Sequence, residues 1–436
     1  MKYYLLILLT LFTVNGFAQQ DTTKVYKKRV LETTEVEFLM SYYSQDGDNA
    51  TVSGGIGTEE LTDITPTFVI SYPLNDDDVL TVDIGISAYS SASTSNIDPF
   101  DGSGEADPFQ ASTGASESDT WVGGTFSYAH SSDDRNGIWS GKVSVSSEYD
   151  YFSIGAGGSY TRLFNEKNTE VGVHGNVYLD TWKLIYPSEL RPFQEGGSGL
   201  DASLFQNNTI TGNEDYNPIF TEHNDKTRNS YSLGFTFSQI LTKNLQGSLS
   251  LDFVSQEGLL STPFHRINFG DIEDSFIENF QLADDIEKLP DTRFKIAIGG
   301  RLNYFVNEII SIRTYYRFYN DDWGIDSHTA SIEIPIKITD KFTLYPSYRY
   351  YTQTAADYFA PHEENLSTQA FYTSDYDLSE FDANQYGFGV SYTDIFTKAH
   401  IWKFGLKNID LRFHQYDRSN GLSAWIISGG IKLLMQ

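Results

Sequence analysis

Residues 293–304 read RFKIAIGGRLNY, and polar and apolar side chains alternate along this stretch. Lys295 and Arg301 have one parity, whereas Ile296 and Leu302 have the other. Successive side chains of an extended chain point to opposite faces, so this pattern predicts a β-strand with one polar and one apolar face. In a membrane barrel the apolar face of such a strand contacts lipid and the polar face lines the lumen.

Similar segments recur along the whole chain and predict an all-β protein. These segments predict sixteen strands, within a range of 14–18, and sixteen is an even number, as single-chain bacterial barrels require. The predicted strand centres lie near residues 38, 67, 84, 125, 143, 157, 174, 234, 250, 298, 313, 333, 348, 388, 407 and 429. Short polar turns alternate with long acidic loops between them. That alternation is typical of a transmembrane antiparallel β-barrel with its short turns in the periplasm.

The N-terminus has the features of a secretory signal. A basic residue precedes an apolar run, and small residues come next at Gly16 and Ala18. We therefore expect a signal peptide at 1–18, a periplasmic N-terminal segment at 19–33 and an outer-membrane barrel at 34–436. The chain has no cysteine, which excludes a disulfide framework and a lipoprotein anchor. Its net charge of −29 argues against nucleic acid as a partner.

One predicted strand changes phase near its start. Trp402, Phe404 and Leu406 share one parity, whereas Ile409 and Leu411 have the other. A β-bulge adds one residue to a strand and reverses the parity of every later residue in that strand. The sequence therefore predicts a bulge near residues 407–408.

The strongest candidates for a lumen site are basic and aromatic residues of the tenth to thirteenth strands. Arginines on the polar face of neighbouring strands create a field that selects or orients anions. The alternative is that these arginines pair with acidic groups on inserted loops and plug the lumen as a structural network. The candidate lumen or ligand residues are Arg293, Arg301, Arg313, Tyr315, Arg317 and Arg349.

The long connection at 258–290 is the main candidate for a constriction or plug, because loops of this length are usually functional or disordered. Apolar spacing between Ile272 and Lys288 suggests a short amphipathic helix within it. A partner-binding surface and a mobile lid are the other interpretations. The candidate plug or gate residues are Pro263, Phe264, His265 and Arg266.

Metal and catalytic signals are weak. Oxygen-rich loops bind Ca²⁺, but the acidic run near residue 100 fits no standard calcium loop. The histidines show no HExxH motif, and no nucleophile and base can be assembled from a recognisable motif. We therefore expect no cofactor, no catalytic residues and no metal site beyond a weak calcium candidate at Asp98, Asp101, Glu105 and Asp107.

Several segments resemble one family of Gram-negative outer-membrane barrels, domain of unknown function 3570. They are DPFQASTGASESDTW (107–121), LSTPFHR (260–266), LPDTR (289–293), DDWGIDSHT (321–329) and YRYYTQTAADYF (348–359). The resemblance implies an outer-membrane β-barrel over the whole mature chain. It supplies no established activity and no catalytic residues.

The sequence thus predicts a bacterial outer-membrane channel, or a transport or reception protein, with an arginine-lined lumen. A plugged barrel that holds surface or periplasmic partner proteins is the alternative. A redox role for such partners is implied by the family resemblance alone, and no residue of the sequence indicates it. An outer-membrane hydrolase is the least favoured class. The expected partners are outer-membrane lipid, the outer-membrane insertion machinery and a periplasmic or surface protein.

Overall fold

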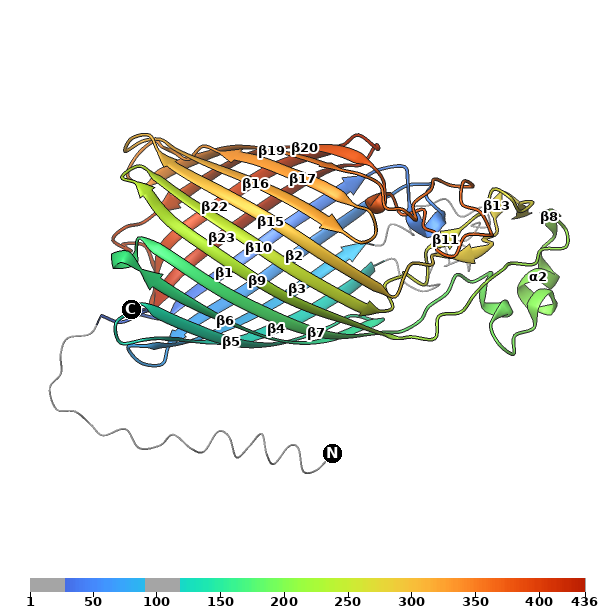
Figure 1. Ribbon diagram of the computed structural model, residues 1–436, viewed down its shortest axis with the longest axis horizontal. Coiled ribbons are helices and arrows are strands. Elements are labelled where there is room, and N and C mark those ends of the chain that lie inside the picture. The colour runs from blue at the N-terminus through green and yellow to red at the C-terminus, as the bar shows by residue number, and fades with distance from the viewer. Residues whose placement is uncertain (1–27, 91–117, 436) are drawn as a thin grey trace, which may run out of the picture.

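The computed structural model describes residues 28–90 and 118–435. These residues form a large antiparallel sheet of 18 strands, of which β18 (Ile336–Lys337) and β21 (His400–Ile401) have only two residues each. The other 16 strands make the wall of a closed barrel (Figure 1). All sixteen predicted strand centres fall in wall strands: β1 (Glu35–Asp46), β2 (Leu61–Pro73), β3 (Asp78–Ser90), β4 (Ser118–Ser131), β5 (Gly137–Ser147), β6 (Tyr151–Phe164), β7 (Thr169–Trp182), β9 (Thr227–Thr242), β10 (Leu245–Gly258), β15 (Thr292–Phe305), β16 (Ser311–Asp321), β17 (Asp326–Glu333), β19 (Phe342–Gln353), β20 (Phe381–Thr393), β22 (Phe404–Arg418) and β23 (Ser423–Met435).

The barrel closes through its first and last strands. β1 pairs antiparallel with β23, with Phe38 opposite Ile431, and also with β2. Each wall strand therefore has a partner on both sides, and no edge of the described wall is left open. Closure of this kind is what a sheet needs in order to cross hydrocarbon.

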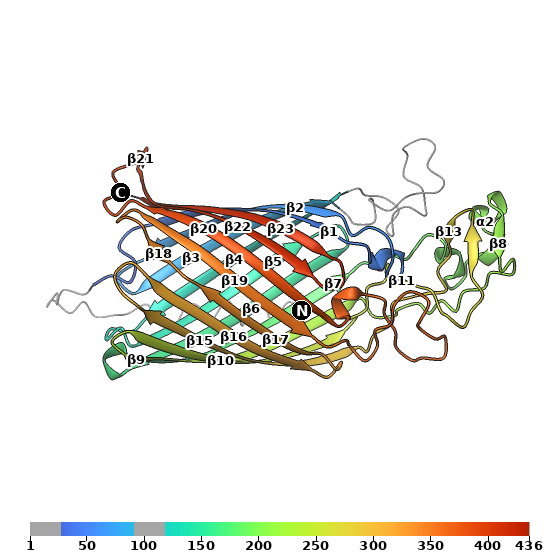
Figure 2. The same ribbon diagram turned by 90° about the horizontal axis from the view of Figure 1, so that it is seen from above.

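The two ends of the barrel differ in their connections. Short turns join the strands at one end, which also holds the C-terminus, whereas the long loops gather at the other (Figures 1 and 2). We call these the short-turn end and the long-loop end. The described part of the N-terminal segment lies at the short-turn end, because Arg29 forms an ion pair with Asp76 of a short turn.

The outer face of the wall is apolar. Large hydrophobic side chains at alternate positions remain exposed, for example Phe126 on β4 and Ile298 and Leu302 on β15. An apolar belt around a closed antiparallel barrel is the surface that contacts lipid in outer-membrane barrels. Among the described residues no helix is long and apolar enough to cross a membrane.

The predicted bulge is confirmed. The pairing of β22 with β23 shifts register between Leu406 and Asn408. Lys407 is the extra residue, and the apolar side chains on either side of it, Phe404 and Ile409, keep to one face despite their opposite parity.

The long loops form a cap beyond the strand ends (Figure 1). We define the cap as residues 183–226, 259–291 and 354–380. Two small sheets organise it: β11 pairs with β14, and β12 pairs with β8 and β13. Its elements, with those of the remaining connections, are β8 (Ile210–Gly212), β11 (Arg266–Ile267), β12 (Ser275–Ile277), β13 (Phe280–Gln281), β14 (Asp285–Ile286), α2 (Ser203–Asn207), η1 (Thr51–Ser53), η3 (Asn165–Lys167), η4 (Arg191–Phe193), η5 (Gly199–Asp201) and η6 (Tyr376–Leu378).

The amphipathic helix expected within 272–288 is wrong. This segment forms β12, β13 and β14, with Glu278 at positive φ in the turn between the first two. The apolar residues do not share one helical face, because Ile277 and Leu282 pack into a cluster with Phe205 whereas Ile286 packs into another with Leu190. The segment also lies beyond the ends of the wall strands (Figure 2).

Candidate functional site in the lumen and at its mouth

Strand register places three of the predicted lumen residues in one row. Arg301 pairs with Tyr315, Tyr315 with Ser331, and Ser331 with Arg349. Residues paired across antiparallel strands project from the same face of the sheet. The neighbouring Tyr316 belongs to the exposed apolar belt, so the row lies on the opposite, inner face.

Three arginines of this inner face carry charges that the described residues do not neutralise. Arg301, Arg317 and Arg349 are exposed, and none forms an ion pair within 28–90 and 118–435. The guanidinium of Arg301 lies 4.9 Å from the ring centroid of Tyr315, and that of Arg349 lies 6.0 Å from Tyr351. The aromatic rings therefore hold these two arginine side chains against the wall while their charge stays accessible.

Arg313 has a different environment. Its guanidinium contacts Glu333 at 2.9 Å, and Arg412 contacts the other carboxylate oxygen at 2.7 Å. Arg412 lies on β22 and reaches Glu333 on β17 across two intervening strands, and the residue that faces Arg412 on β20 is Gly389. This part of the inner face is a neutralising network, but its carboxylate comes from wall strand β17 and not, as the structural alternative expected, from an inserted loop.

Acidic groups occupy the opposite part of the wall. Asp63 on β2 and Asp83 on β3 alternate with the exposed Ile64 and Ile84 of the outer belt, so both carboxylates belong to the inner face. In a barrel of 16 strands, β2 and β3 lie half the circumference away from β15 and β16. Charges of opposite sign therefore face each other across the lumen.

Arg293 builds the rim of the long-loop end. Its Nε donates a hydrogen bond to Asp321 at 2.9 Å, and its guanidinium lies 4.2 Å from the ring centroid of Trp323. The other oxygen of Asp321 accepts from the backbone N–H groups of Trp323 and Ile325, both at 3.0 Å. Asp321 thus joins β15 to the turn after β16, and Arg293 has a structural partner.

A polar pocket of about 250 Å³ lies at the mouth, where the strand ends meet the cap. We call it the mouth pocket. Lys295 on its wall side forms no ion pair with the described residues, whereas Arg228 contacts Asp180 at 3.3 Å. Its lining residues are Arg228, Gln256, Leu260, Thr262, Glu287, Leu289, Arg293, Lys295, Trp323, Asp375 and Leu378. Cations from the wall and carboxylates from the cap therefore share one pocket.

The predicted gate motif LSTPFHR lies in the interior of the cap. Arg266 donates to both oxygens of Glu189, at 2.6 and 3.1 Å, and its third contact is the carbonyl of Val52 at 2.7 Å. The Arg266 side chain is 4% exposed and that of Glu189 is fully buried. The ion pair joins two loops, and the hydrogen bond to Val52 connects the same arginine to a third.

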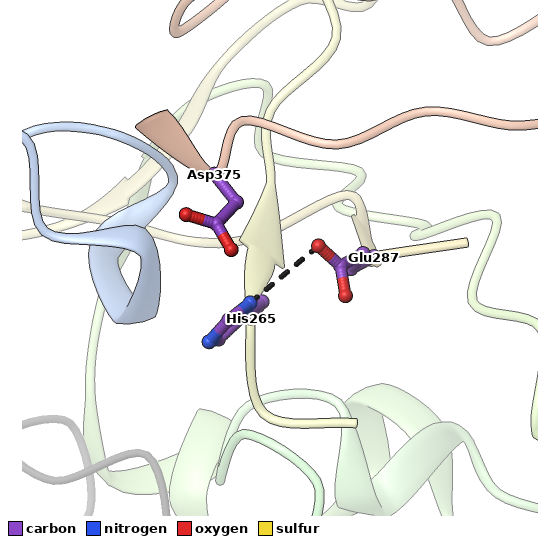
Figure 3. A group of neighbouring side chains, drawn as sticks. All are labelled: His265, Glu287 and Asp375. Carbon is purple, nitrogen blue, oxygen red and sulfur yellow. Dashed lines mark ion pairs between the residues drawn. The ribbon is translucent and has the colours of Figure 1, made fainter. Parts of the chain in front are cut away.

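His265 lies beside two carboxylates of the cap. Its Nδ1 is 3.5 Å from Glu287, and Asp375 approaches from a different loop (Figure 3). Burial acts to lower the pKa of His265 and to raise that of Glu287, but their mutual contact outweighs burial and reverses both directions. Burial, together with Asp377, raises the pKa of Asp375 to about 6.

The remaining predicted residues either pack within the cap or lie outside the described residues. Pro263 is buried, and the ring of Phe264 packs edge-on against His265 with 5.3 Å between ring centroids. The calcium candidates Asp98, Asp101, Glu105 and Asp107 and the predicted signal peptide lie outside the described residues.

Sequence reasoning missed the partners of the gate motif. Glu189 and Asp375 lie in long loops without periodicity, and Glu287 was assigned to a helix that does not form. The available signal was the motif itself: an arginine and a histidine in an apolar setting require acidic partners, although the spacing could not show which ones.

The solved structures that the chain resembles share little of its sequence. The chain resembles a bacterial polysaccharide outer membrane secretin, at 9% identity and a TM-score of 0.46, over 92% of this chain and 98% of that one. It also resembles a BenF-like porin from Pseudomonas fluorescens Pf-5, at 9% identity and a TM-score of 0.38, over 93% and 100%. These similarities concern general architecture and carry no functional argument. No curated protein matches the chain.

The family match extends over nearly the whole sequence. The model of the protein of unknown function DUF3570 matches residues 5–435. This range includes every wall strand and the whole cap. The chain therefore belongs to the DUF3570 family.

Proposed function

We propose that this protein is a channel of the bacterial outer membrane that favours small anionic solutes. The observation that carries the proposal is the group of exposed arginines on the inner face, Arg301, Arg317 and Arg349, which have no ion pair with the described residues. Charges that line a narrow aqueous path through a low-dielectric wall act on ions more strongly than charges on an open surface. As an integral barrel, the protein contacts outer-membrane lipid and requires the insertion machinery of that membrane.

The orientation rests on the loops. Outer-membrane barrels have short periplasmic turns and longer extracellular loops. We therefore assign the short-turn end to the periplasm and the cap to the cell surface. In this orientation a solute enters from outside past the cap and meets the mouth pocket with Lys295, Arg228 and Arg293 before it reaches the arginine row.

The cap lies where it can control the entry of solutes into the lumen. Its buried ion pair and hydrogen bonds join loops that begin on different sides of the mouth, which is how a lid is held in place. We propose that the segment 258–290 sets access from above the lumen, as a cap and not as an inserted plug.

Ion selectivity of the reconstituted protein tests the proposal. In a planar bilayer under a KCl gradient, the wild-type protein should show a reversal potential whose sign indicates that chloride passes more readily than potassium. Changing Arg301, Arg317 and Arg349 together to glutamine should shift that potential towards zero or towards cation preference. Arg29→Gln is the control, because Arg29 lies outside the barrel wall. A conducting wild type whose selectivity is the same in the triple variant would contradict the proposal.

One observation favours the alternative, a scaffold for a periplasmic partner. The turn between β20 and β22 at the short-turn end exposes Ile395 (62%), Phe396 (75%) and Trp402 (90%). Apolar patches of this kind mark contact with lipid headgroups or with another protein. In a variant whose other five tryptophans are changed to phenylalanine, quenching of Trp402 fluorescence by brominated lipid distinguishes the two. Strong quenching in native membranes to which that lipid is added indicates lipid contact, and protection there but not in pure brominated lipid supports a partner.

A further inference from the structure

The three side chains His265, Glu287 and Asp375 come from separate segments of the cap. His265 precedes β11, Glu287 comes directly after β14, and Asp375 lies in the loop before β20. One ligand atom from each residue lies within 4.8 Å of the other two. Figure 3 shows the side chains directed towards one another around a shared space.

The carboxylates are held in place by neutral donors only. Glu287 is fully buried and accepts hydrogen bonds from the hydroxyl of Thr373 and the backbone N–H of Thr262, both at 2.6 Å. Asp375 accepts from the N–H of Asp377 at 2.9 Å. No lysine or arginine of the described residues forms an ion pair with Glu287 or Asp375. The group therefore has two oriented carboxylates and one imidazole to offset their charge.

The imidazole of His265 also has a buried nitrogen without a hydrogen-bond partner. His265 Nδ1 is buried and has no hydrogen-bond partner, because its contact with Glu287 is long at 3.5 Å. A buried polar atom without a partner is costly in a protein interior. A cation placed between the nitrogen and the two carboxylates would satisfy the nitrogen lone pair and neutralise the acidic excess.

We propose that His265, Glu287 and Asp375 bind one divalent transition-metal cation, with Zn²⁺ as the best match to their donor atoms. One nitrogen and two oxygen ligands suit zinc, whereas Ca²⁺ and Mg²⁺ take oxygen ligands. Zinc holds such atoms at about 2.0–2.2 Å from the ion, so ligands that are up to 4.8 Å apart close by roughly 1 Å on binding. Water or a solute oxygen completes the shell.

The location gives the cation a defined role. Glu287 and Asp375 line the mouth pocket, so the ion fastens the loop 259–291 to the loop 354–380 directly above the path into the barrel. Metal binding therefore tightens the cap, and its removal loosens the cap without any change in the wall.

Calorimetric titration of the full mature chain with ZnCl₂ tests this site. The chain is refolded in detergent, stripped with a chelator, and shown to be folded by its heat-dependent mobility on gels. Wild type should bind one Zn²⁺ per chain, and His265→Gln and Asp375→Asn should each weaken the Kd at least tenfold. Co²⁺ in place of Zn²⁺ should give an absorption band in the visible range that is lost in His265→Gln. Conservative changes at two separate ligands protect the test against one variant that does not fold.

Glu148→Gln is the matched control. Glu148 forms a rim cluster of carboxylates with Asp119 and Asp150 on another part of the long-loop end, without a histidine. The control should bind Zn²⁺ as wild type does. The proposal is overturned if wild type binds no Zn²⁺ in a saturable one-to-one manner, or if binding survives both ligand changes, or if Glu148→Gln alone abolishes it.

Discussion

The barrel wall and the cap bury opposite kinds of residue. The wall carries its large apolar side chains on the outside, where Phe126, Ile298 and Leu302 remain exposed. The cap has a conventional interior, with apolar clusters around Leu190 and Phe269, but it also buries charged groups. The wall is built for hydrocarbon and the cap for water. One chain therefore combines two kinds of packing, and the mouth pocket lies at the boundary between them.

This difference shows in which region stability depends on individual side chains. Backbone hydrogen bonds between neighbouring strands hold the wall, and they do not depend on any one side chain. The cap has little regular structure, and individual polar contacts join its loops. Single substitutions should therefore be tolerated in much of the wall and should have local, large effects in the cap.

Breaking the buried ion pair of the cap should have the largest effect. Arg266→Ala leaves the Glu189 carboxylate buried without its partner, which costs about 3–5 kcal/mol. Amide exchange of Asp284, whose N–H donates to the carbonyl of Ile267, should accelerate accordingly. The wall strands should keep their protection.

Arg29→Ala is the matched control for that change. The pair of Arg29 and Asp76 is half exposed at the short-turn end, with 48% exposure for each side chain, and exposed pairs contribute about 0–1 kcal/mol. Similar losses at the two pairs would contradict the idea that the cap depends on buried charge.

Charge placed on either face of one strand should define the lipid contact. Phe126→Arg puts a cation on the apolar belt and should cost about 2–4 kcal/mol if the site lies near the bilayer midplane. Thr125→Arg, one residue away, points inward beside Asp83 and should cost much less. Equilibrium unfolding of the barrel in urea, in the presence of lipid, measures both. Equal costs would mean that the outer face does not contact lipid.

The stability of the cap should also depend on pH. This effect should be smaller than those of the substitutions above, and the stability of the wall should not follow it. Burial, together with neighbouring carboxylates, raises the pKa of Asp284 to about 7. The folded state then holds a proton that the unfolded state releases near pH 4, so the stability from Asp284 is lost as the pH rises from about 4 to about 7. Amide exchange of the cap, corrected for the intrinsic exchange rate at each pH, should show less protection at pH 8 than at pH 5. Asp284→Asn should flatten this dependence, and an unchanged slope would assign it to other groups.

Periodicity made the wall predictable. Alternation along stretches such as 293–304 is a local property, and it located all sixteen strands. The phase change near residue 407 even located a bulge, because one inserted residue must reverse every later side chain. The boundaries came from turn residues, as in the short turn at Asn75–Asp78.

The cap could not be predicted in the same way. Glu189 meets Arg266 across 77 positions of the chain, and Asp375 meets His265 across an even longer separation. No local pattern encodes such contacts. The segment 272–288 was misassigned because its apolar residues serve two clusters, which resembles helical spacing when read in one dimension. The lumen arginines were placed in strands by parity, but only strand register shows that Glu333 bridges Arg313 and Arg412.

Single-channel conductance, with and without the loop 259–291, tests the central claim most directly. The backbone N–H of Gly258 donates to the carbonyl of Asp291, so a short glycine-serine turn can replace the loop without parting β10 and β15. A channel covered by a cap predicts anion-selective current in the intact protein and larger current after the replacement. Silence in both proteins, when each is folded and inserted, would contradict the channel and favour the scaffold.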